Sequence, residues 1–137
     1  MRLWVLLSAL LSLALAGEAA PAGRDSVLAM LAAQAKHSDA SFAGFSADRG
    51  RVFWTSTHNG GNPETKACTA CHTQDPHAIG QTRAGKSIQP MAISRNPERF
   101  TDPHKVEQWF TRNCKTVLGR ECTPIEKGDV ITYLATQ

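Results

Sequence analysis

The stretch from Cys68 to Phe100 constrains the fold of this 137-residue chain more than any other feature. It shows little hydrophobic periodicity and is broken repeatedly by proline and glycine, at Pro76, Gly80, Gly85, Pro90 and Pro97. Such a long irregular stretch is uncommon in a compact domain unless it wraps something. We therefore expect a large bound group to supply the core that this stretch does not supply itself.

The motif that opens this stretch identifies the group. Cys68-Thr69-Ala70-Cys71-His72 is the attachment signature of c-type haem. Each thiol can add to one vinyl group of a single porphyrin, and the histidine that follows is held beneath the iron as its proximal ligand. We predict one covalent haem c, bound through Cys68 and Cys71, with His72 on the iron.

Two other uses of the cysteines fit less well. A redox dithiol needs no histidine after its second cysteine. A tetrahedral zinc site would require a second cysteine pair two to four residues apart, and Cys114 and Cys122 are eight apart.

The first 16 residues resemble a secretory signal peptide. Arg2 precedes an uncharged run from Leu3 to Ala16, which ends in the small-x-small pattern Ala14-Leu15-Ala16. The run is shorter than the roughly 20 residues that span a bilayer, although an uncleaved anchor is the alternative. We predict a periplasmic protein with a signal peptide at residues 1–16, an N-terminal helical extension at 17–45 and a cytochrome c domain at 46–137.

Composition excludes several other classes. With 42% hydrophobic and 20% charged residues, the chain is typical of one small globular domain. Its 15 basic residues face 12 acidic ones and are scattered, so no strong positive field favours nucleic acid. We expect no nucleic-acid partner and a monomer.

Capping signals define the helices. Residues 24–37 form either a helix or a loose arm. Ser46 is a candidate cap for a helix over 47–56, in which Gly50 permits close approach of the C-terminal helix. Asp102 before Pro103 begins a helix that Gly119 ends, and Thr123-Pro124-Ile125-Glu126 begins a last helix that runs to about Ala135. No segment is typical of a strand, so we predict an all-α fold.

The second iron ligand decides the function, and Met91 is the first candidate. A methionine opposite His72 would make a low-spin electron carrier. However, Met91 lies only 19 residues after His72, and a chain that supplied both ligands would have to pass round the edge of the porphyrin. This short separation favours packing of Met91 at the haem edge over binding to the iron. Pro90 could offer its carbonyl to the other ring nitrogen of His72.

Asn113 is the second candidate. Positions 106, 109, 110, 113, 114 and 117 form one apolar stripe that contains this amide, so we expect the amide to be buried and to need a partner. A nearby carbonyl and an iron ion are the alternatives, and the residues alone favour the carbonyl. His104 points to the opposite face, and we rank it below Asn113 together with His37, His58 and His77.

A family resemblance extends this interpretation. Phe110-Thr111-Arg112-Asn113-Cys114, followed by Leu118-Gly119-Arg120-Glu121-Cys122, resembles the sphaeroides haem protein family. The related cytochrome c double-prime is similar but has histidine at the place of Asn113. The resemblance continues through residues 96–102 and 123–127 and covers the chain from about Ser46 onward.

The resemblance implies a class I cytochrome c fold, Asn113 as the distal iron ligand and a disulfide between Cys114 and Cys122. In the family, the asparagine leaves on reduction, and oxygen or nitric oxide then binds. It also implies a dihaem cytochrome c and a membrane cytochrome b as redox partners. The leading function is a high-spin, ligand-binding cytochrome c. The alternatives are a low-spin carrier that uses His72 and Met91, or a small reductase of oxygen or nitrogen oxides, for which we assign no catalytic residue.

Overall fold

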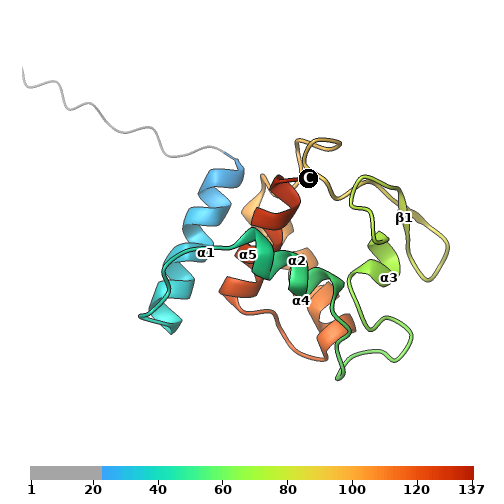
Figure 1. The fold of residues 1–137 in the computed structure, drawn as a ribbon, viewed down its shortest axis with the longest axis horizontal. Coiled ribbons are helices and arrows are strands. Elements are labelled where there is room, and N and C mark those ends of the chain that lie inside the picture. Colours follow the sequence, from blue (N-terminus) through green and yellow to red (C-terminus); the bar gives the residue numbers. More distant parts are fainter. Residues whose placement is uncertain (1–22) are drawn as a thin grey trace, which may run out of the picture.

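The computed structural model describes residues 23–137, and the predicted signal peptide lies outside this range. The described residues form five helices: α1 (Arg24–Ser38), α2 (Ala47–Thr55), α3 (Thr69–His72), α4 (Pro103–Leu118) and α5 (Pro124–Ala135). A small antiparallel pair, β1 (Gly80–Gln81) and β2 (Ser87–Ile88), is the exception to the predicted all-α fold. Figure 1 shows α1 at one end of the molecule and α3 with β1 at the other, with α2, α4 and α5 between them.

The predicted helix ends are confirmed. Asp102 accepts hydrogen bonds from the backbone N–H groups of His104 and Lys105, and Gly119 ends α4 in the left-handed conformation, with φ of 70°. Thr123 and Glu126 form the complete capping box of α5. These caps satisfy backbone groups that a helix leaves unpaired at its ends.

The crossing of α2 and α5 depends on Gly50. A Cβ atom at this position would collide with the backbone carbonyl of Asp129 and would lie 2.9 Å from Cβ of Tyr133. The predicted close approach of the two helices is therefore confirmed, and it brings Trp54 into a buried cluster with Val130 and Leu134.

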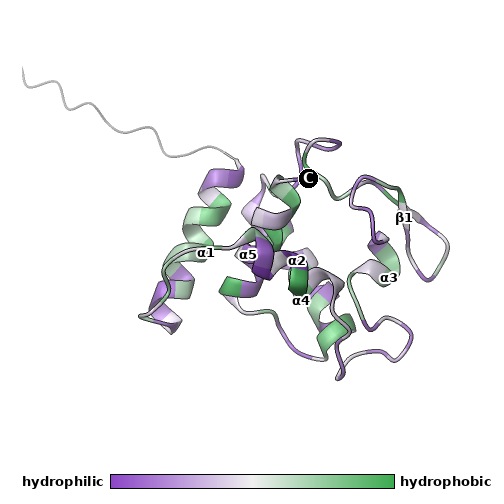
Figure 2. Ribbon diagram, in the orientation of Figure 1, coloured by the Kyte–Doolittle hydropathy of each residue, from purple (hydrophilic) through white to green (hydrophobic). Residues whose placement is uncertain are grey.

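Helix α1, which the sequence left undecided, is formed and belongs to the core. Val27 and Leu31 are fully buried, where they pack with Val106 of α4 and Ile131 of α5. Figure 2 shows that apolar segments recur along α1 and α4. The N-terminal helix therefore buries the outer side of α5, on the side of the molecule away from α3.

Two ion pairs hold α5 in place, and both use a buried α5 side chain. Asp129 accepts from Arg49 of α2, with 2.7 Å between Nε and Oδ2, and from the backbone N–H of Ser46 at 2.6 Å. Lys127 donates to both carboxylate oxygens of Glu107 on α4, at 2.8 and 2.7 Å. Because each buried charge is paired, neither carries the penalty of an isolated buried ion.

Within the described residues, no helix is long and apolar enough to cross a membrane.

The disulfide between Cys114 and Cys122 is present, and it joins α4 to the segment before α5. Both cysteines are only 5% exposed, so an external reductant has little access to the bridge. This burial favours a structural role over redox exchange.

The Gly50 contact predicts a specific loss of stability. Gly50→Ala improves helix propensity, yet its methyl group meets backbone at the crossing, so we expect the free energy of unfolding to fall by about 1–3 kcal/mol. Thermal unfolding followed by circular dichroism measures this, with Arg51→Ala, an exposed position on the same helix, as the control. A Gly50→Ala protein as stable as the control would contradict the close crossing.

The disulfide makes a second prediction. Replacing Cys114 and Cys122 together by serine should lower the free energy of unfolding by about 2.5 kcal/mol, because the unfolded chain is no longer constrained by this short loop. Denaturant unfolding measures the change. The native protein should also resist mild thiol reductants that reduce the bridge once the chain is unfolded. Rapid reduction of the folded protein would contradict the structural role.

Candidate haem site

The attachment motif lies on the one-turn helix α3, at the start of the irregular stretch. Cys68 and Cys71 carry free thiols and are half-buried. The chain leaves the motif abruptly, because Thr73 takes a positive φ of 64°, which is uncommon for a residue other than glycine. At Gly80, a Cβ atom would collide with the carbonyl oxygen of Cys71, so β1 packs directly against the motif.

The chemistry of Cys68 differs from that of a redox dithiol. Burial raises the pKa of its thiol to about 11. The group is therefore a neutral thiol at neutral pH, whereas reactive cysteines depend on a lowered pKa. Cys68 also packs against the apolar cluster of Trp54 and Met91.

His72 has the properties of a neutral metal ligand. Burial lowers the pKa of its imidazole to about 4, and the nearby positive charge of Arg99 adds to the effect. The ring is therefore uncharged at neutral pH, which is the form that binds a metal. Its Nδ1 atom is buried and has no hydrogen-bond partner among the described residues.

Trp54 forms a wall beside this histidine. The centres of the two rings are 5.3 Å apart, with their planes inclined by 33°. The indole Nε1 of Trp54 and the hydroxyl of Thr65 are also buried without a hydrogen-bond partner in the described part of the chain. Unpaired buried polar atoms are rare in folded proteins. Here they accompany the two free thiols and a neutral imidazole, a donor set that fits haem c.

The brace predicted for His72 is wrong. The Pro90 carbonyl accepts instead from Nε of Arg99 at 2.6 Å, and the Gln89 carbonyl accepts from Nη2 of Arg99 at 2.5 Å. A guanidinium presents several donors in a fixed fork, so it holds two successive carbonyls together. The backbone carbonyl of Arg99 accepts in turn from Arg24, which links α1 to this segment.

Met91 lies in the core. It is 9% exposed and belongs to the cluster of Trp54, Tyr133 and Leu134. Its backbone N–H donates to the carbonyl of Pro76 at 2.8 Å, which fixes the chain at this point. This is the packing role that the sequence favoured over iron ligation.

The predicted single stripe of α4 divides in two. Val106 and Cys114 are buried and Phe110 is half-buried, so these positions face the core. Asn113 and Trp109 are exposed, with Trp109 at 54%. The expectation that the amide of Asn113 is buried among protein side chains is wrong, because the core face is centred on Phe110 and Asn113 lies to one side of it. Asn113 thus lies on a flank with Trp109, one residue before the disulfide.

The C-terminal end of α4 contacts the loop that leads to the attachment motif. The backbone N–H of Asn62 donates to the carbonyl of Thr116 at 2.7 Å. A Cβ atom on Gly61 would collide with the same carbonyl, and Gly119 packs equally closely on Gly60. Glycines in this loop therefore allow backbone to lie on the helix that carries Asn113.

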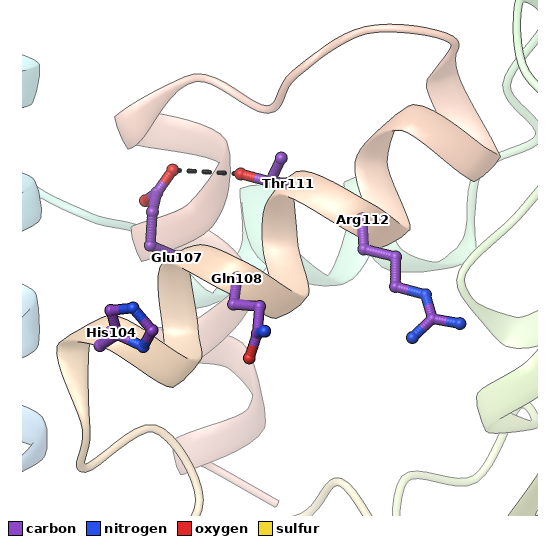
Figure 3. A pocket seen from close by; sticks show the side chains of 5 residues that line it. All are labelled: His104, Glu107, Gln108, Thr111 and Arg112. Carbon is purple, nitrogen blue, oxygen red and sulfur yellow. Dashed lines mark hydrogen bonds between the residues drawn. The ribbon is translucent and has the colours of Figure 1, made fainter.

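The four other histidines of the described residues are bonded within the protein or exposed. His58 Nε2 lies 3.0 Å from the carbonyl of Phe53, and His77 Nδ1 lies 2.9 Å from Asp75. His104 lines a shallow hollow on the surface of α4, shown in Figure 3 with Glu107, Gln108, Thr111 and Arg112. All five of these residues come from one helix, which argues against a haem pocket at the hollow. His37 is exposed in the last turn of α1.

Among the described residues, no three histidine, cysteine, aspartate or glutamate side chains gather into a metal-binding group. The disulfide also removes Cys114 and Cys122 from any zinc site. Sequence reasoning missed Arg99 and the unpaired indole of Trp54, since both depend on contacts between distant segments. For Arg99, the one available signal was its position close in sequence to Pro90, whose carbonyl it binds.

Comparison with known proteins identifies relatives of this chain. The profile of a family described as a domain of unknown function, DUF1924, matches residues 40–134. The cytochrome c-type protein SHP of Cereibacter sphaeroides is 53% identical over 91 residues, which cover 66% of this chain and 70% of SHP. Cytochrome c'' of Methylophilus methylotrophus is 39% identical over 89 residues, which cover 64% of this chain and 62% of the relative.

Solved structures show the same fold. The structure of oxidized SHP, described as an oxygen-binding cytochrome c, is 45% identical, has a TM-score of 0.77, and is matched over 85% of this chain and 98% of SHP. The crystal structure of oxidized cytochrome c'' from Methylophilus methylotrophus is 33% identical, with a TM-score of 0.72 and coverage of 83% and 94%. The chain therefore has a cytochrome c fold and belongs to the DUF1924 family, and it is a relative of the sphaeroides haem protein and of cytochrome c''.

Proposed function

We propose that this protein is a periplasmic monohaem cytochrome c that transfers electrons and binds small ligands such as oxygen and nitric oxide. Haem c, when bound, supplies an iron that accepts an electron and offers a coordination position. Cys68 and Cys71 would attach it through thioethers, and His72 would hold the iron from the proximal side. The protein residues then decide when the opposite position is available.

The observation that carries the proposal is the contrast between Met91 and Asn113. Met91, the stronger ligand, is buried in the core against Trp54 and Leu134. Asn113 is exposed on a flank of α4, which the disulfide and the Asn62–Thr116 hydrogen bond hold in place. The 53% identity to SHP supports the same choice, because oxidized SHP is described as an oxygen-binding cytochrome c.

An asparagine amide suits a redox-dependent release. The amide is neutral, so only its dipole attracts it to the iron, and this attraction is weaker for ferrous than for ferric iron. Asn113 would therefore occupy the distal position in the oxidised protein and leave it on reduction. While it is bound, the apparent affinity for other ligands falls with the fraction of open sites.

The partners and location belong to the same proposal. We infer export to the periplasm through the N-terminal 16 residues and electron exchange with a dihaem cytochrome c and a membrane cytochrome b. Reduction of oxygen or a nitrogen oxide is a second candidate function, because a site that opens on reduction leaves room for a substrate at the iron.

The first test is spectroscopic. We expect the dithionite-reduced protein to be high-spin and to bind carbon monoxide at once, because a neutral amide does not hold ferrous iron. Absorption spectra of the oxidised, reduced and carbon monoxide-treated protein measure this. A reduced low-spin protein that ignores carbon monoxide would show a strong ligand such as Met91 and an ordinary electron carrier.

The second test separates the two candidate ligands. Asn113→Ala should open the ferric site, so that the spin state changes and cyanide binds faster than to the native protein. Met91→Leu is the matched control: it conserves apolar volume, should cost less than about 1.5 kcal/mol of stability, and should leave the spectra unchanged. The proposal fails if Met91→Leu alters the ferric spectrum while Asn113→Ala does not.

A further inference from the structure

We propose that Arg112 is an anion-binding residue at the distal side of the haem site, where it favours small anionic ligands over neutral ones. This inference rests on the proposed function, because it takes Asn113 as the distal ligand. It names the class of ligand that competes best with Asn113 at the oxidised iron: monovalent anions such as azide or nitrite.

The argument begins with the two flanks of α4. Successive residues of a helix are 100° apart, so Asn113 and Trp109, four residues apart, share one side of the core face. Glu107 and Thr111 share the other side, where Lys127 of α5 binds Glu107. The side chains of Asn113 and Trp109 lie on the flank that α5 does not cover.

The side chain of Arg112 reaches toward this open flank. Its Cζ atom lies 5.7 Å from the centre of the Trp109 ring, a distance at which a guanidinium is attracted to an aromatic face. Figure 3 shows Arg112 extending from α4 on the side away from Glu107 and Thr111. The indole therefore draws a positive charge toward the side of the helix that carries Asn113.

This charge is not neutralised within the described part of the protein. Arg112 forms no ion pair there, whereas Lys105 and Lys115 lie 3.9 and 3.5 Å from the carboxylates of Asp102 and Glu121. The one acidic residue within α4 is Glu107, which lines the same surface hollow as Arg112 but is paired with Lys127. No unpaired carboxylate of α4 therefore offsets the charge of Arg112.

A guanidinium that is attracted to an aromatic ring can still bind an anion. The cation–π attraction acts on the charge of the group and leaves its N–H donors, which lie in the plane, available. Hydrogen bonds from such donors to an anion are strengthened by the charge. Trp109 thus fixes the position of Arg112, and Arg112 supplies the donors beside the position from which Asn113 is released.

The experiment compares a charged ligand with a neutral one. Azide and imidazole are titrated into the oxidised haem-loaded protein, and binding is followed by absorption. We expect Arg112→Gln to raise the Kd for azide about two- to fivefold, as expected for the loss of one exposed charge interaction. The Kd for imidazole should not change, Arg112→Lys should restore part of the azide affinity, and the difference should shrink at high salt.

Lys36→Gln is the control for net charge. Lys36 is exposed in the last turn of α1, at the end of the molecule away from α3, so its loss should leave both Kd values unchanged (Figure 1). An equal effect of Lys36→Gln and Arg112→Gln on azide would show a general charge effect and overturn the proposal.

The other outcomes are equally decisive. Equal weakening of azide and imidazole by Arg112→Gln would show that Arg112 only supports the helix. If Arg112→Gln shifts the reduction potential but leaves the Kd for azide unchanged, Arg112 pairs with the carboxylates of the haem itself and not with the bound anion. Either result overturns the proposal. If the native protein binds neither azide nor carbon monoxide, the proposed function fails as well, whereas normal binding with no effect of Arg112→Gln removes only this inference.

Discussion

The contact between α2 and α5 at Gly50 is the constraint on which the rest of the structure depends. Backbone meets backbone there, and the buried Asp129 receives Arg49 beside the same crossing. The crossing fixes the direction in which α2 ends, and so it places Trp54 beside the ring of His72. Packing between two helices outside the attachment motif thus determines one wall of the haem site.

The two sides of this site are built from different kinds of interaction. On the proximal side, Arg99 ties the Gln89 and Pro90 carbonyls, and Arg24 ties the carbonyl of Arg99 to α1. On the side of α4, a covalent bridge and backbone contacts with the 60–62 loop position Asn113. Hydrogen bonds with charged donors hold one side and a disulfide holds the other, and Met91 of the irregular stretch adds a buried side chain to the core.

Local signals in the sequence predicted much of this. The Asp102 and Thr123 caps and the left-handed Gly119 were predictable because a cap and its partners are close in sequence. The division of the α4 stripe was not predictable. Hydrophobic periodicity places Trp109 and Phe110 in the same stripe but does not show which of the two side chains packs against the core. The burial of Lys127 and Asp129 depends on partners in other helices, and the two-residue strands are too short to produce a pattern.

The position of the disulfide also has a consequence for motion. Cys114 directly follows Asn113, so the bridge anchors the backbone of α4 at the very point where the proposed ligand is attached. A shift of the helix would have to carry the segment before α5 with it. The proposed release of Asn113 would therefore be a rotation about its side-chain torsions, which, once the bond to iron is broken, belongs to the picosecond-to-nanosecond range of exposed rotamers and not to the slower range of helix displacements. Opening of the site would then follow the arrival of an electron without delay.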